Sequence, residues 1–286
     1  MSGNAQDAEI KEIMKSYQDR LMKIYNHFSK EAWIGAFASF IAGFLGNIYM
    51  IINHTLDNDY LDSFNPRIFS IGQGRWLWNI CGVIITPFNS AMFSAILLMF
   101  LFALFTLFLL DSFEIKSKIF AVIAGIFVSV SPVVCCFMTY GGGSFLFAIG
   151  LPFAILALRE YDKGVKGLII AALCSLLTIV GYQPTIAVLI ALFYSKLTLE
   201  LFDEKVDIKK WIIKFLKVFG LLIISVVLYV ITNNIAGLFE ENATKFVIGV
   251  TTKEVEAFGY EAAGDASNLH LTYFVSSMVL AYKNFL

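Results

Sequence analysis

Apolar residues form long uninterrupted runs along the chain, and short polar segments separate these runs. A helix that crosses a bilayer needs about 20 consecutive apolar residues. We therefore predict an all-α polytopic membrane protein with about seven to eight spans. The runs that carry this prediction are residues 33–52, 91–110, 119–140, 142–158, 168–201, 215–232 and 271–286.

The run 168–201 is 34 residues long, too long for one upright crossing. Its centre reads "GYQPT", where Pro184 removes a backbone donor and Gly181 weakens the helix. We predict two short spans joined by a turn at this point. One kinked and tilted helix is the alternative.

Residues 1–32 have a different pattern, in which apolar side chains recur every three or four positions and basic side chains lie between them. This spacing predicts an amphipathic helix with a basic face, suited to lie on the cytoplasmic membrane surface. An ordinary surface helix packed on the protein is the alternative. We treat 33–286 as a single transmembrane domain.

The distribution of Lys and Arg predicts the orientation, because cytoplasmic loops are enriched in these residues. With the N-terminus inside, sixteen lie in inner segments and four in outer ones, and Lys283 is unassigned. The large outer loops are then 53–90 and 233–270. Residues 76–88 are apolar but end near Pro87, so we predict a helix along the outer surface rather than a span.

Composition agrees with a membrane protein, since 15% of residues are charged, against about a quarter in soluble domains. A net charge of -1 argues against nucleic acid as a partner. The runs 91–110, 119–140 and 168–195 contain no Asp, Glu, Lys, Arg or His. Transporters usually keep ionisable groups at mid-membrane, so this absence disfavours transport. The polar groups gather instead in the outer loops, which points to chemistry at the outer surface.

The first outer loop begins with acidic residues in "NHTLDNDYLD". Asp57 and Asp59 are two apart, so they share one side of an extended segment. One carboxylate can act as a general base while the other tunes its pKa, or the pair can hold a divalent cation. His54 lies three residues before Asp57, on the same face if that turn is helical. The competing interpretation is a solvated acidic loop.

Donors follow in the same loop. Arg67, Arg75 and Gln73 suit a phosphate group, and Trp76 offers a flat face for a sugar ring. Tyr182 and Gln183, in the "GYQP" turn, are expected to emerge at the outer end of two spans and face this loop. The alternative is that Gln183 only satisfies backbone groups beside Pro184.

Taken together, these residues resemble the bacterial Gtr type II membrane glucosyltransferases, which are similar to the GT-C class of multi-span glycosyltransferases. The resemblance rests on the polar N-terminus, the acidic pair Asp57 and Asp59, Arg67 followed by Gly74–Trp76 ("GRW"), and "YQ" at 182–183. It covers roughly residues 15–200. The family tends to have adjacent acids where this chain has "DND". Its members are usually longer, so we expect a shortened relative or a fragment.

The resemblance implies a GT-C-like helical bundle in the bacterial inner membrane that moves glucose from polyprenyl phosphate to a surface glycan such as O-antigen. Asp59, or else Asp57, would be the base, and Arg67 and Arg75 would bind the donor phosphate. The expected sugar- or acceptor-binding residues are His54, Gln73, Trp76, Tyr182 and Gln183. Other functions stay open: a flippase or transporter for a lipid-linked sugar, or a non-catalytic assembly partner.

Overall fold

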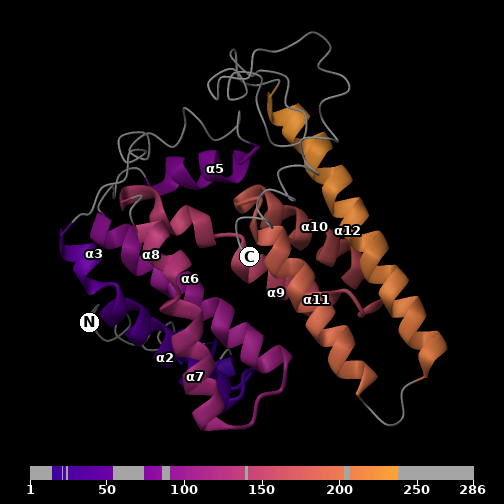
Figure 1. Cartoon of the computed structure of the whole chain (residues 1–286), viewed down its shortest axis with the longest axis horizontal. Coiled ribbons are helices and arrows are strands. Elements are labelled where there is room, and N and C mark those ends of the chain that lie inside the picture. Colours follow the sequence, from indigo (N-terminus) through magenta and orange to yellow (C-terminus); the bar gives the residue numbers. More distant parts are fainter. Residues whose placement is uncertain are drawn as a thin grey trace, which may run out of the picture.

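The computed structural model describes residues 15–20, 22–23, 25–53, 74–85, 91–138, 141–202 and 207–237. Every regular element in these ranges is a helix (Figure 1). The elements before residue 113 are α2 (Lys30–Gly46), α3 (Ile48–Asn53), α5 (Trp76–Ile85) and α6 (Ala91–Ser112). The later ones are α7 (Lys118–Ser129), α8 (Pro132–Met138), the 3-10 helix η2 (Gly141–Ala148), α9 (Leu151–Glu160), α10 (Gly164–Gly181), α11 (Thr185–Leu201) and α12 (Ile208–Gly237).

Three helices in the described ranges are long and apolar enough to cross a membrane: Met92–Ser112, Gly164–Gly181 and Ile208–Ala236. A fourth span results if α7 and α8, which are bent by 44° at their junction, cross together. The prediction of an all-α polytopic membrane protein is thereby confirmed. Residues 271–286, predicted to begin a further span, lie outside the described residues.

The run 168–201 is divided in two, as predicted. Helix α10 ends at Gly181 and α11 begins at Thr185. Thr185 stabilises the turn, because its hydroxyl donates to the carbonyl oxygen of Thr178 over 2.7 Å. This bond helps to satisfy a carbonyl at the end of α10, where the helical ladder stops.

Two other apolar runs, each predicted as one span, are divided into two helices. The run 33–52 stops being helical at Asn47, between α2 and α3, and the run 119–140 bends between α7 and α8. The buried Asn47 amide joins both breaks: its Nδ2 donates to Gly43 O (2.8 Å) and Ser129 O (3.4 Å). The Cys135 thiol in turn donates to Asn47 Oδ1 over 3.1 Å. These breaks are therefore cross-linked by hydrogen bonds.

The run 142–158 also differs from a single straight span, since it consists of η2 followed by α9. The glycines at 141–143 form the start of η2. Three consecutive glycines have low α-helical propensity, which favours the tighter 3-10 geometry here. Gly150 lies between the two helices, where an added Cβ would be 2.6 Å from Thr178 O.

Two helices organise the packing. Helix α6 contacts α2, α7, η2 and α9, while α10 contacts α5, α9, α11 and α12. Leu98 and Met99 of α6, Ile155 of α9, and Leu189 and Phe193 of α11 are fully buried in the main core. The bundle thus fixes the ends of α10, α11 and α12 relative to one another.

Charged side chains gather where α6, α9 and α11 end and α10 and α12 begin, which we call the basic end. Ion pairs here join Arg159 to Asp111 (2.8 Å), Lys217 to Asp162 (3.1 Å) and Lys214 to Glu200 (3.0 Å). The opposite end holds the α10–α11 turn and the end of α12. Helix α5 lies crosswise over this end of the bundle (Figure 1), which we call the α5 end. A short surface helix at 76–85 agrees with the prediction for this segment.

Candidate functional site

Three polar side chains from distant parts of the sequence form a hydrogen-bonded chain at the α5 end. Arg75, just before α5, donates from Nε to Oε1 of Gln183 in the α10–α11 turn over 2.9 Å. Gln183 donates from Nε2 to the hydroxyl of Tyr229 on α12 over 3.2 Å. These bonds connect the segment just before α5 to the last part of the long α12 helix. We call Arg75, Gln183 and Tyr229 the polar chain.

Aromatic rings surround the guanidinium of Arg75. Its Cζ lies 4.6 Å from the ring centre of Trp78 and 5.1 Å from that of Tyr182, within the range of cation–π attraction. Phe147 of η2 makes edge contacts with both rings, at 4.9 and 5.0 Å. The indole N–H of Trp78 donates to the carbonyl oxygen of Gly181. The rings and the polar chain therefore hold the guanidinium in one orientation.

Local sequence explains how Arg75 reaches this position. Gly74 is buried and has φ of 75°, a left-handed conformation that side chains with a Cβ rarely adopt. Helix α5 starts at the next residue but one, so Arg75 leaves the turn directly toward the α10–α11 junction. Gly181 serves the same junction, because a Cβ there would lie 3.0 Å from the backbone of Gly150.

Four predicted site residues lie in the described ranges, and they lie at the α5 end. Arg75 and Gln183 are hydrogen-bonded, Tyr182 faces the guanidinium, and Trp76 packs against the cluster that contains Tyr229. These contacts bring the "YQ" pair beside Arg75, and its position at the outer end of two spans stays a prediction. Five predicted residues lie outside the described ones: His54, Asp57, Asp59, Arg67 and Gln73.

A metal site was predicted only for Asp57 and Asp59, so the structure does not test it. Among the residues that the structure describes, no group of three His, Cys, Asp or Glu could hold a metal ion. The roles of Asp57 and Asp59 stay predictions.

Sequence analysis missed Tyr229 as a member of this site. The signal was weak, because Tyr229 shares the largely apolar run 215–232 with Lys217 and with the hydroxyls of Ser225 and Thr232, although polar groups in a span usually face the bundle interior. Tyr229 is buried, and its hydrogen bond to Gln183 joins positions 46 residues apart. No local pattern encodes that pairing.

Cys81 of α5 lies near these groups in sequence but does not fit a catalytic role. Its side chain is half-buried against the main core, and burial raises the pKa of its thiol above the ordinary value of 9.0. The thiol is therefore protonated at neutral pH, whereas nucleophilic cysteines need a lowered pKa.

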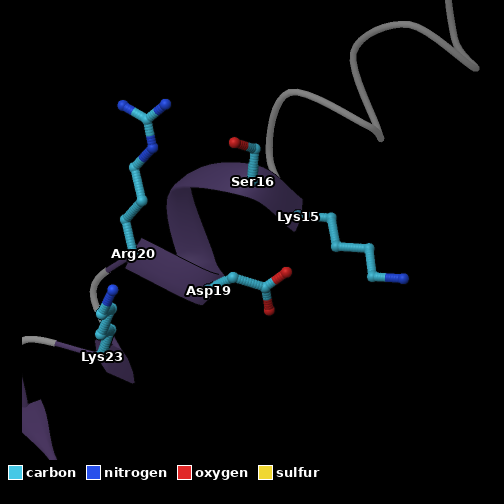
Figure 2. A pocket seen from close by; sticks show the side chains of 5 residues that line it. All are labelled: Lys15, Ser16, Asp19, Arg20 and Lys23. Carbon is cyan, nitrogen blue, oxygen red and sulfur yellow. The ribbon is translucent and has the colours of Figure 1, made fainter.

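An open hollow lies elsewhere, along the N-terminal segment. Figure 2 shows its lining side chains, which extend in different directions from the backbone: Lys15, Ser16, Asp19, Arg20 and Lys23. All five residues are exposed. Exposed cations of this kind suit an anionic surface, as predicted for an interfacial helix, rather than a buried reaction centre.

The fold and the polar chain define a multi-span membrane protein with a site of aromatic and hydrogen-bonding groups at one end of its bundle. The family model "Glucosyl transferase GtrII" matches residues 48–281, and the chain belongs to this family. It is therefore a glycosyltransferase, as predicted. The match extends past residue 200 toward the C-terminus but does not include the polar N-terminus, on which the resemblance also rested. No curated protein and no solved structure matches the chain, so the GT-C-like arrangement stays a prediction.

Proposed function

We propose that this protein transfers glucose from a polyprenyl-phosphate donor to a cell-surface glycan on the outer side of the inner membrane. Family membership supports glucose as the sugar. The observation that carries the rest is the Arg75–Gln183 hydrogen bond inside an aromatic shell at the α5 end. It provides an oriented guanidinium beside apolar helices, which suits a phosphate on a lipid anchor.

Arg75 would stabilise the leaving group. When the bond between sugar C1 and the phosphate oxygen breaks, the bonding electrons stay on the polyprenyl phosphate, which gains negative charge. A preorganised donor aimed at developing charge lowers the barrier more than one that must reorient. The bond from Nε to Gln183 and the flanking rings supply that preorganisation.

The acidic pair would supply the base. The acceptor hydroxyl oxygen attacks C1 as the bond to phosphate breaks, and its proton passes to the carboxylate of Asp59, or else of Asp57. General-base catalysis of this kind contributes roughly 10²–10⁴-fold to the rate. The acceptor then carries the glucose, and the products are the glycosylated glycan and polyprenyl phosphate.

The distribution of charge supports an outer site. From residue 30 onward, Arg75 is the one described Lys or Arg at the α5 end, and the others flank helix ends at the basic end. Lys and Arg near span ends favour the cytoplasmic side. We place the basic end and the N-terminus in the cytoplasm, with the α5 end outside.

Glucose transfer tests the proposal directly. Membranes containing the protein receive polyprenyl-phosphate-linked labelled glucose and acceptor glycan, and transfer is compared among wild type, Asp57→Asn and Asp59→Asn. We expect Asp59→Asn to lower transfer by roughly 10²–10⁴-fold. Lys163→Gln, which changes an exposed cation at the basic end, should transfer at the wild-type rate.

Unchanged transfer in both Asp variants would remove the role of the acidic pair. No transfer by the wild type from this donor would exclude the donor assignment itself. Repeating the wild-type assay with a chelator shows whether a divalent cation takes part.

A further inference from the structure

Two asparagines, Asn47 at the α2–α3 break and Asn233 on α12, are equally buried but differ in their partners. Each is 1% exposed. The amide of Asn47 donates to two carbonyls and accepts from a thiol, as a structural residue in an apolar interior should. Within the described part of the chain, Asn233 has no hydrogen-bond partner for either Nδ2 or Oδ1. Burying an amide without partners is unfavourable, so Asn233 calls for a specific explanation.

The position of Asn233 supplies one. It follows Tyr229 by four residues on α12, so the two side chains share a helix face one turn apart. Tyr229 is the last member of the polar chain. Asn233 therefore extends the row of polar groups that begins at Arg75.

A second unsatisfied group lies at the same end. The indole Nε1 of Trp76 is buried and, among the described residues, has no hydrogen-bond partner. The Trp76 ring packs on the cluster of Leu176, Ile179, Val180 and Tyr229. Unpaired donors and an unpaired acceptor thus flank the polar chain on α5 and α12.

Among the described residues, the other buried side-chain polar atoms without partners are hydroxyls, which are easier to explain. They are the hydroxyls of Ser39, Ser112 and Ser175, each of which can rotate toward a carbonyl one turn earlier in its own helix. Oδ1 of Asn233 needs a donor instead. The backbone N–H groups inside a helix are already bonded within it, so the backbone of α12 offers none.

We propose that Asn233 binds a hydroxyl group of the transferred hexose and so contributes to selection of the sugar. A sugar hydroxyl donates and accepts, which matches Oδ1 and Nδ2 of one amide, and the Trp76 indole provides a further donor. This inference rests on the proposed function, because the hexose is the one carried by the polyprenyl-phosphate donor. Arg75 would hold the phosphate while Asn233 holds the ring.

The test uses the full-length protein and a series of donors. Polyprenyl-phosphate-linked glucose is compared with its 2-, 3-, 4- and 6-deoxy forms, for wild type and Asn233→Leu. We expect the wild type to lose about 10- to 100-fold in kcat/KM on one deoxy donor, the cost of leaving a buried polar group unpaired. For Asn233→Leu, we expect kcat/KM on the glucose donor to fall by the same factor. Replacing glucose with that deoxy donor should then cause no further loss.

Matched variants separate a binding role from a structural one. Ser175→Ala removes another buried unpaired group and should leave the donor preference unchanged. Asn47→Leu should lower the melting temperature and reduce kcat/KM by the same factor on every donor. Asn233→Ser, which is smaller and keeps a hydroxyl, provides the comparison if Asn233→Leu does not fold.

The outcomes are distinct. A uniform loss over all five donors in folded Asn233 variants, or no loss, would overturn this inference and leave the proposed function standing. A wild type that transfers no sugar from the glucose donor would overturn the proposed function, and the role of Asn233 with it.

Discussion

Arg75 and Arg159 are surrounded in similar ways but lie at opposite ends of the molecule. Each guanidinium lies over two aromatic rings: Trp78 and Tyr182 for Arg75, Phe28 and Phe108 for Arg159. Arg159 is paired with Asp111, whereas Arg75 donates to the neutral Gln183. The first arrangement pairs opposite charges, and the second orients the guanidinium that would bind the donor phosphate in the proposed function.

The same substitution at both positions should therefore have different effects. Lysine keeps the charge but loses the planar fork and its stacking. We expect Arg75→Lys to lower kcat by about 10²–10³-fold, the usual cost of removing one stabilising donor, with little change in melting temperature. Arg159→Lys should lower the melting temperature and retain most activity. Equal losses of activity in the two variants would contradict a special role for Arg75.

The residues of the site differed in how far sequence could identify them. Arg75, Tyr182 and Gln183 were predicted because polar groups are conspicuous beside apolar runs and a proline-broken turn. Tyr229 and Asn233 were not, because their importance depends on which helix neighbours the α10–α11 turn. That neighbour is set by tertiary packing, and Gln183 and Tyr229 are 46 positions apart.

Among the elements, α2 and α7 approach most closely through small residues. An added Cβ on Gly125 would lie 2.3 Å from the carbonyl oxygen of Gly35 and 3.0 Å from the nitrogen of Ser39. Backbone atoms cannot move aside as flexible side chains can. Small residues at such crossings let helices pack without a gap in a membrane.

Gly125→Ala should therefore destabilise the fold by about 1–3 kcal/mol, the usual cost of overpacking. Gly220→Ala on α12 is the matched control, since a Cβ there meets nothing within 4 Å. The control should be neutral or stabilise by up to about 1 kcal/mol, because alanine favours helix. Thermal unfolding in detergent measures both. A stable Gly125→Ala protein would show that this crossing is looser than described.

Hydropathy predicted where the elements lie but not where they break. Pro184 marked the division of 168–201, since proline has a local signature. The break between α7 and α8 has a local signature of the same kind, because Pro132 is the first residue of α8, whereas the break at Asn47 has no proline beside it. A hydrogen bond from Asn47 to the carbonyl oxygen of Ser129, 82 positions away, links the two breaks, and no local pattern encodes that pairing.

At the scale of the whole molecule, the separation of charge predicts how the protein sits in the bilayer. Reporter fusions after Glu114, in the α6–α7 turn, should report the cytoplasm. Fusions near residue 60 should report the outer side. Moving the fusion point to Lys163 provides a second cytoplasmic reference. A cytoplasmic signal at residue 60 would be incompatible with an outer site for sugar transfer.

The contact between Cys135 and Asn47 bears on any labelling study of this chain, which first requires a cysteine-free background. The thiol at 135 supplies the proton that Asn47 Oδ1 accepts in a dry interior. Serine at position 135 keeps a hydrogen-bond donor, whereas alanine leaves Asn47 Oδ1 without the donor from this position. A cysteine-free protein for labelling should thus carry Cys135→Ser. Labels on a Cys135→Ala protein would report on a structure in which the break between α2 and α3 is less well held.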